Sequence, residues 1–309
     1  MFRPLTPLDA ASLKALPPSS LKEHARVFER CLPNESDSLS SWALLQQFLP
    51  VKKRRKILVW SVGPKLAGLV SLRQMAGPTA WEVEHLLLRE DLLGDSIPFL
   101  EALCKTAGAS GAEKLFLRVH QESSLLHVAA QAGFLCYQNE TIYVRAKAVA
   151  PQAQGPYLPL RPTTAQDAYP LFRLYTAVFP QSVRCAEALT FQQWSAGRSL
   201  PWSSRNRQEW VLEEDGRLKG WLLAARRGGK GLLALTAHPD ARGIEERLLT
   251  TGLGALGHRA QVRMFVPDHQ PHLQALLESH GFAKAADFAS LARQLTVVER
   301  GPRLVPVGA

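Results

Sequence analysis

Two carboxylates in a short apolar segment are the residues best suited to acid–base chemistry. Glu82 and Glu84 stand two positions apart in residues 81–85. If this segment is a β-strand, both side chains lie on one face and His85 is packed on the other. A carboxylate pair of this kind can bind a primary amine or take a proton from it. The alternative is a solvated strand face with no chemical role.

Three other kinds of chemical site have little support in the sequence. His269 and His272 are three residues apart, but no third ligand completes a metal site. Residues 228–231 lack the spacing and the Ser or Thr of a P-loop, and we predict a hairpin turn there. No two cysteines are close in sequence, so we expect free thiols rather than a metal site: Cys31, Cys104, Cys136 and Cys185.

The elements that must position these residues occur twice. Four segments recur in the same order at a nearly constant separation of about 150 residues. They predict a strand before a capped helix, a β-hairpin, a strand leading through a turn to a helix, and a helix that ends in Gly-Phe. The pairs are residues 2–10 with 160–168, 59–68 with 211–220, 86–103 with 235–253, and 119–134 with 267–282.

Local signals at equivalent places support this repeat. Asp9 and Asp167 each stand where a helix should start, and a carboxylate there can cap free amide groups. Asp215 is followed by glycine, which is typical of a tight hairpin turn. Gly133 and Gly281 stand where a helix needs a left-handed cap.

The repeat predicts two domains and a linker. We place the first domain at residues 1–147 and the second at residues 157–297. Residues 148–156 are rich in Pro, Gln and Gly, as linkers are. Residues 298–309 carry further Pro and Gly, and we expect a loose tail.

The order of elements in each half, with Arg-Pro early and Gly-Phe late, resembles a domain of the GNAT N-acetyltransferase superfamily. The resemblance covers nearly all of both halves and rests on element order and a few short signatures. It implies an α/β fold, with a mixed sheet flanked by helices. The whole chain would then be two tandem acyl-CoA N-acyltransferase-like domains.

The resemblance also implies a site for acetyl-coenzyme A. In the family, backbone amides at a helix N-terminus hold the pyrophosphate, which the helix dipole favours. In the second half the matching residues are Arg242, Gly243 and Ile244, although the family's later glycines are missing. In the first half only Gly94 is retained. Acidic residues stand near both loops, and a plain strand-to-helix turn is the alternative.

The catalytic groups that the resemblance implies are incomplete. Carboxylates on the fourth strand commonly act as the base in this family, which makes Glu84, with Glu82, the catalytic candidate. The tyrosine acid that is usual on the last helix is replaced by Ala129 and Leu277. An asparagine that commonly starts this helix is replaced in both halves: Glu122 and Gln270.

Charge and hydropathy limit the partners. The net charge is +10, with a dense basic cluster at residues 52–56. No aromatic residues interleave with this cluster, so we expect a solvated loop rather than a nucleic-acid site. No apolar stretch is long enough to span a membrane, and residues 1–5 lack a signal peptide's apolar region. We therefore expect a cytoplasmic protein.

Two functions remain open from the sequence. The first is an N-acyltransferase that moves an acetyl group from acetyl-coenzyme A to a primary amine of a small molecule or peptide. The second is a non-catalytic ligand- or protein-binding module on the same fold, because fold alone does not fix function. The oligomeric state also stays open, including a monomer whose halves form an intramolecular pseudo-dimer.

Overall fold

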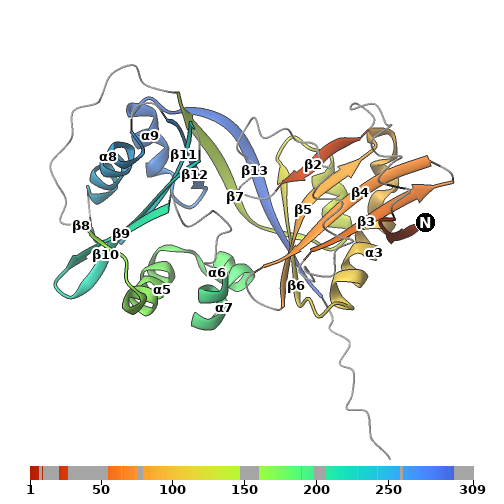
Figure 1. Ribbon diagram of the computed structural model, residues 1–309, viewed down its shortest axis with the longest axis horizontal. Helices are drawn as coiled ribbons and strands as arrows, with labels where there is room; N and C mark the ends of the chain where they lie inside the picture. The colour runs from red at the N-terminus through yellow and green to blue at the C-terminus, as the bar shows by residue number, and fades with distance from the viewer. Residues whose placement is uncertain are drawn as a thin grey trace, which may run out of the picture. The chain divides into compact units, whose positions relative to one another are not determined.

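The chain forms two compact units of mixed α/β structure, which confirms the predicted fold class (Figure 1). Unit 1 contains Met1–Val119, Ser123–Leu135 and the chain from Leu291 onward, and unit 2 contains His120–Glu122 and Cys136–Ser290. The computed structural model describes residues 1–6, 9, 21–26, 55–63, 65–75, 79–146, 160–188, 190–197, 207–227, 229–241, 243–257 and 260–295.

The sheet of unit 1 has the strand order β1-β3-β4-β5-β2-β6. β3 and β4 form the predicted hairpin, with Gly63 at φ +58° in its turn. β5 is antiparallel to β4 and parallel to β6. The strand bounds are Phe2–Pro4 for β1, Lys22–Arg26 for β2, Arg55–Val62 for β3, Lys65–Gln74 for β4, Ala80–Leu88 for β5 and Lys114–His120 for β6.

Two helices cover one face of this sheet, α3 (Ile97–Gly108) and α4 (Leu125–Gln131). Alternate strand residues such as Val70 and Leu72 share one buried cluster with both helices. Intervening residues such as Leu69 belong to a smaller cluster on the opposite face. The period of two along each strand therefore sends apolar side chains into both layers.

The sheet of unit 2 has the order β7-β12-β11-β10-β9-β8, with β13 beside β7. Asp215 at φ +51° and Gly216 at φ +68° make the predicted hairpin turn between β9 and β10. Arg227 lies opposite Lys230, which confirms the second predicted hairpin. The bounds are Leu135–Arg145 for β7, Leu160–Pro162 for β8, Arg207–Glu214 for β9, Arg217–Arg227 for β10, Lys230–Ala237 for β11, Gln261–Pro267 for β12 and Ala283–Gln294 for β13.

Helices cover both faces of the unit 2 sheet (Figure 1). Leu212 and Leu222 pack with α8 and α9, whereas Val211 packs with α5 on the other face. The helix bounds are Ala168–Val178 for α5, Gln181–Glu187 for α6, Phe191–Gly197 for α7, Ile244–Leu256 for α8 and His272–Ser279 for α9.

Both units end their last helix in the same way. Gly133, after α4, and Gly281, after α9, each have φ +78°, as the sequence predicts for left-handed caps. The amide of the following phenylalanine donates back to the helix in each case. Phe134 bonds the carbonyl of Ala129 at 3.0 Å, and Phe282 bonds that of Leu277 at 3.0 Å.

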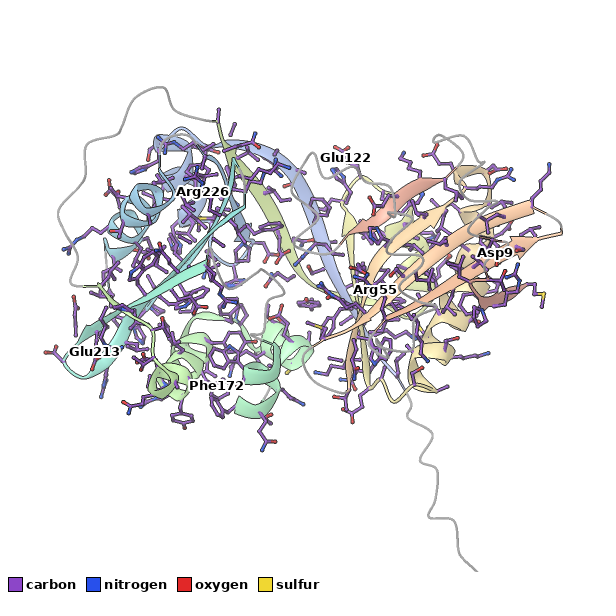
Figure 2. The ribbon with its side chains drawn as sticks, viewed as in Figure 1. Asp9, Arg55, Glu122, Phe172, Glu213 and Arg226 are labelled. Atoms are coloured by element: carbon purple, nitrogen blue, oxygen red, sulfur yellow. The ribbon has the colours of Figure 1, made fainter. Side chains whose placement is uncertain are left out.

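An aspartate opens each repeat and joins a short strand to the chain that follows. Asp167 accepts from the amide of Thr164 at 2.7 Å and from two nitrogens of Arg161 at 2.7 and 2.8 Å, which confirms its predicted cap. These donors hold the pKa of the Asp167 carboxyl well below its ordinary value. The same contacts and the same pKa direction recur in unit 1, where Asp9 (labelled in Figure 2) accepts from Arg3 and Thr6.

The compact units do not follow chain order. β7 ends the first sequence repeat but pairs antiparallel with β12, with Tyr143 opposite Met264. At the end of β13, Leu291 is part of the unit 1 core, and the amide of Leu295 bonds the carbonyl of Glu113 at 2.8 Å. Each unit thus contains strand residues from the other repeat. The domain limits at residues 147 and 157 stay a prediction from the repeat.

Candidate functional site

The loop between β11 and α8, predicted to hold a cofactor, is a tight turn onto a helix. The amide of Ala241 donates to the carbonyl of His238 at 2.8 Å. Gly243 has φ +76°, a left-handed conformation that favours glycine, and α8 starts at Ile244. The Ile244 side chain is buried in the core, so only its backbone can serve a ligand. Arg242 lies outside the described residues.

The two central strands of unit 2 part at the end nearest this loop. β11 and β12 are paired in parallel from Lys230 opposite Gln261 to Leu233 opposite Met264. Residues 234–237 continue β11 and pair with β10 on one side. On the other side, no described strand pairs with them. As far as the described residues go, this edge therefore offers backbone groups that are free to bind an extended ligand.

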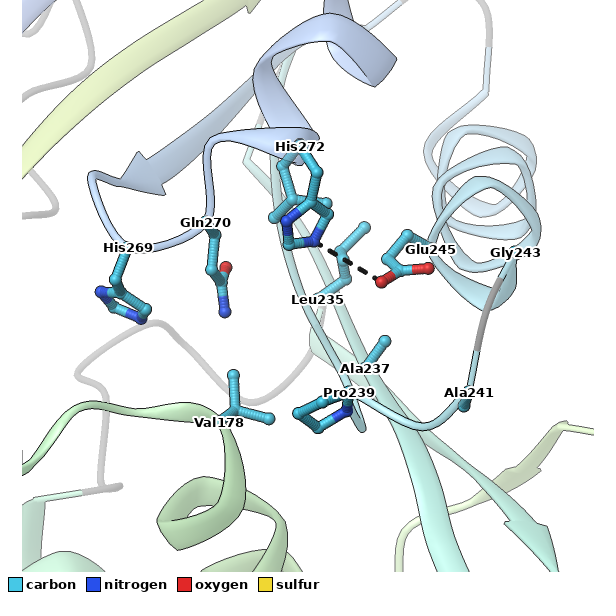
Figure 3. Close-up of a pocket in the computed structure, with 11 residues that line it drawn as sticks. Val178, Leu235, Ala237, Pro239, Ala241, Gly243, Glu245, His269, Gln270 and His272 are labelled. Carbon is cyan, nitrogen blue, oxygen red and sulfur yellow. Dashed lines mark ion pairs between the residues drawn. The ribbon is translucent and has the colours of Figure 1, made fainter.

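A pocket of about 470 Å³ lies at the open end of these strands (Figure 3). Its apolar wall includes Leu235 and Ala237 of β11, Pro239 of the loop and Val178 at the end of α5. Gly243 lies at its border with α8. Four residues bring polar atoms to the lining: Glu245, His269, Gln270 and His272.

His269 is the most unusual polar group of the pocket. Its side chain is 12% exposed, and both ring nitrogens are buried without a hydrogen-bond partner among the described residues. The ring of Phe179 meets it edge-on at 5.2 Å between centroids. Burial lowers the pKa of His269, although Asp268 at 3.9 Å and Glu140 act in the opposite direction. A neutral imidazole with a free lone pair can accept a proton.

Glu245 brings a negative charge to the start of α8. It is the second residue of the helix, and its carboxylate lies 3.5 Å from Nε2 of His272 (Figure 3). Its neighbour Glu246 does not line the pocket and lies 3.9 Å from Nε2 of His280. Both glutamates thus stand in the first turn, where the helix dipole favours a negative charge.

In unit 1 the equivalent strands, β5 and β6, also separate, and a third strand pairs with both of them. β5 and β6 are paired in parallel from Ala80 opposite Lys114 to Glu82 opposite Phe116. Beyond that point β2 pairs antiparallel with β5, and Ala25 of β2 also pairs with Val119 of β6. The edge that is open on β11 is therefore covered on β5.

Polar contacts tie β2 to its place. Lys22 donates to Glu90 at 2.5 Å, and Glu23 meets Nδ1 of His85 at 2.6 Å inside the unit. Gly94, the predicted cofactor residue of this half, is exposed in a 3-10 turn (Gly94–Ser96) after β5. Its role in binding acetyl-coenzyme A stays a prediction.

The predicted pair of glutamates lies on one face of β5, in ion pairs. Glu82 accepts from Nε of Arg73 at 2.6 Å. Glu84 is almost fully buried, pairs with Arg55 and accepts from the hydroxyl of Ser71 at 3.1 Å. Each carboxylate thus has a cationic partner within unit 1, and a catalytic role for either stays a prediction.

The expected orientation of His85 is wrong because β5 contains a β-bulge. Ser71 lies opposite His85 and Leu72 opposite Val83, so Glu84 is the extra residue. The bulge turns His85 to the face of Ser71, which is the face of the glutamates. The prediction that His85 is packed is confirmed, because it is fully buried.

In the family, a tyrosine acid and an asparagine occupy positions on or at the start of the last helix. In this protein some of these positions are in the core and one is in the pocket. Ala129 and Leu277 are buried core residues. Gln270 lines the pocket, and apart from its position no sequence signal predicts this role. Of the basic cluster at residues 52–56, only Arg55 and Lys56 are described. Lys56 lies 5.7 Å from the ring centre of Trp81.

The described residues lack two further kinds of feature. They contain no group of three or more His, Cys, Asp or Glu placed to hold a metal ion. None of their helices has the length and apolar character needed to cross a membrane.

Neither a family model nor a curated protein matches the sequence. Solved structures do match its fold. A GCN5-related N-acetyltransferase from Sphaerobacter thermophilus is 15% identical, with a TM-score of 0.58 and 95% of each chain covered. A tandem GNAT protein from the clavulanic acid biosynthesis pathway is 14% identical, with a TM-score of 0.54 over 95% of this chain and 98% of that one.

A putative acetyltransferase from Pyrococcus horikoshii is 12% identical, with a TM-score of 0.51 over 96% of this chain and 90% of that one. At such identities the likeness concerns the fold, and function must be argued from the site. The protein has the GNAT fold, in the tandem form that its internal repeat predicts.

Proposed function

We propose that the protein is an N-acyltransferase whose active site is in unit 2, and that it transfers an acetyl group from acetyl-coenzyme A to a primary amine of a small molecule or peptide. The open edge of β11 at residues 234–237, beside a pocket of about 470 Å³, carries this proposal. A cleft with a free strand edge and a few polar groups is a suitable binding site for a small ligand.

The strand edge suits the arm of an acyl-coenzyme A. This pantetheine arm is extended and contains two amide groups, which can hydrogen-bond to the backbone as an added strand does. Leu235, Ala237 and Pro239 supply apolar contacts beside the edge. The thioester would then lie within the pocket that His269 lines.

His269 is the base in this proposal. The amine nitrogen attacks the thioester carbon, so that a C–N bond forms and the C–S bond breaks. The nitrogen's proton passes to the neutral imidazole, and the sulfur leaves as a thiolate. Thiols ionise near pH 8.5, so the thiolate is a tolerable leaving group without a dedicated acid.

Filling the pocket tests the proposal directly. Ala237 is partly buried on β11 and lines the pocket, so Ala237→Trp fills the space, whereas Ala237→Ser leaves it open. In isothermal titration we expect acetyl-coenzyme A to bind the natural protein with a Kd near or below roughly 100 µM, about −5.5 kcal/mol. We expect Ala237→Trp to weaken binding at least about tenfold and Ala237→Ser to keep it.

With a panel of amine acceptors, we expect turnover to fall in Ala237→Trp and to be kept in Ala237→Ser. No binding by the natural protein would refute the proposal. Equal binding by the natural protein and a folded Ala237→Trp variant would move the site out of this pocket.

For unit 1 we propose the second function, a non-catalytic module. The observation that favours it is the pairing of β2 with both β5 and β6, at the place where unit 2 is open. Glu82, Glu84 and Gly94 are the residues whose substitution tests this assignment. Loss of turnover in a folded Glu84→Gln variant would return the catalytic base to unit 1.

A further inference from the structure

The start of α8 already contains a negative charge. Glu245 is 21% exposed and lines the pocket, close to the backbone amides that begin the helix. Those amides and the helix dipole favour an anion. The carboxylate of Glu245 is such an anion, and it repels a second one brought by a ligand.

A positive charge beside Glu245 depends on the protonation of His272. His272 lies 3.5 Å from Glu245, is 60% exposed, and is charged only when protonated. His269 is held neutral by burial. The remaining described lining residues, including Ala237, Pro239 and Gln270, carry no charge. The described part of the pocket therefore offers an anionic phosphate no fixed cation.

The rest of the pocket suits a neutral ligand. The open edge at residues 234–237 presents backbone groups, and the apolar wall of β11 runs beside it. Both features match an amide-bearing arm rather than a pyrophosphate. The described lining of the pocket, which leaves out Arg242, thus fits one part of acetyl-coenzyme A and opposes another.

We infer that unit 2 recognises its acyl donor through the pantetheine arm and thioester and not through the pyrophosphate, and that Glu245 is the residue that sets this preference. The inference rests on the proposed acyltransferase function. It implies that a thioester without phosphates, such as acetyl-pantetheine, is as good a ligand as acetyl-coenzyme A.

Adjacent glutamates provide a matched pair of variants. Glu245→Gln removes the charge that lines the pocket, whereas Glu246→Gln removes an equal charge from the same helical turn outside the pocket. Each variant is titrated at about 50 mM salt, where screening is weak, with acetyl-coenzyme A, acetyl-pantetheine and inorganic pyrophosphate. Thermal unfolding shows that each variant is folded.

In the natural protein we expect the two thioesters to bind within roughly threefold of each other and pyrophosphate not to bind. In Glu245→Gln we expect acetyl-coenzyme A to gain at least about fivefold over acetyl-pantetheine, because the repulsion is gone. Glu246→Gln should keep the natural ratio, since its charge lies outside the pocket.

Two results would overturn the inference while leaving the acyltransferase proposal intact. One is a natural protein that binds acetyl-coenzyme A at least about tenfold more tightly than acetyl-pantetheine. The other is an equal gain in the Glu245→Gln and Glu246→Gln variants, which would show a long-range charge effect. Failure of both thioesters to bind the natural protein would overturn the proposed function and this inference together.

Discussion

The two units differ most at the place where their central parallel strands part. In unit 1, β2 covers the place where β5 and β6 separate after Glu82. In unit 2, no described strand covers the place where β11 and β12 separate after Leu233, beside a pocket. A strand edge needs hydrogen-bond partners, which are another strand, water or a ligand. One scaffold can thus be closed by its own chain or kept open for a ligand.

One buried histidine in each unit shows a related difference. In unit 1, Glu84 is paired with Arg55, and Nδ1 of His85 with Glu23, whereas Nε2 of His85 has no hydrogen-bond partner among the described residues. In unit 2, neither ring nitrogen of His269 has a hydrogen-bond partner among the described residues. An unsatisfied buried polar group costs about 1–3 kcal/mol, so its retention in a pocket points to a functional use.

The largest expected effect is the loss of activity on replacing His269, compared with replacing Glu84. His269→Gln keeps the polarity and much of the volume but removes the base. We expect kcat for acetyl transfer to fall by about 10²–10⁴-fold, as when a general base is lost. Glu84→Gln is the comparison in unit 1, and steady-state kinetics of both variants decide between the units. A greater loss in Glu84→Gln would reverse the comparison.

The pH profile of kcat/KM identifies the base more closely. Burial lowers the pKa of His269 below the ordinary 6.5, so the imidazole is neutral at pH 7. Activity should be constant above that value and fall as the pH drops through the lowered pKa, because the protonated ring cannot accept a proton. A profile with no fall in kcat/KM on the acid side would exclude His269 as the base.

A buried charge in β2 tests whether that strand closes unit 1. Ala25 is 1% exposed and pairs with both β5 and β6. We expect Ala25→Asp to lower the free energy of unfolding by about 3 kcal/mol in denaturant titrations. Binding of acetyl-coenzyme A should keep one site per chain. A second site in a folded variant would show that unit 1 is only blocked by β2.

The opening aspartates test what the units have in common. Asp167→Asn and Asp9→Asn each remove a carboxylate held by an arginine and a threonine, and we expect a loss of about 2 kcal/mol in unfolding free energy. The folded pKa is lowered, so this stability is present above the unfolded pKa near 4 and is lost as the pH falls below it. Denaturant titrations at pH 7 and pH 3 should show a smaller difference in each variant than in the natural protein.

The smallest effect is expected at the surface of β2. Lys22 and Glu90 form an ion pair in which both side chains are largely exposed to solvent. Lys22→Ala should leave the denaturation midpoint within experimental error, because solvent and salt screen such pairs. A clear loss of stability would mean that this contact, and not the backbone pairing of Ala25, holds β2 in place.

Much of the fold follows from local sequence signals. The hairpin at Asp215, the caps at Gly133 and Gly281, and the aspartate at residue 167 are all found where the sequence predicts them. Each depends on residues a few positions apart, so a linear pattern contains what is needed. The start of α8 after Gly243 could be predicted for the same reason.

The site itself could be predicted only in part. The loop at residues 238–243 was found by its resemblance to a family pattern, but His269 carried no signal except its spacing from His272. Its ring is buried and contacts Phe179, which is distant in the chain. The bulge at Glu84 and the pairing of that residue with Arg55 likewise arise from the register between strands.

By itself, the sequence determined the repeat, the order of elements and the positions of the turns, because these depend on short-range periodicity and backbone preference. Tertiary structure decided which edge of each sheet is covered. The two repeats have equivalent strands, so local pattern does not specify that β7 pairs with β12. Nor does it specify that β2 pairs with both β5 and β6. Those choices are made by long-range hydrogen bonding and packing, and they leave one strand edge closed and the other open.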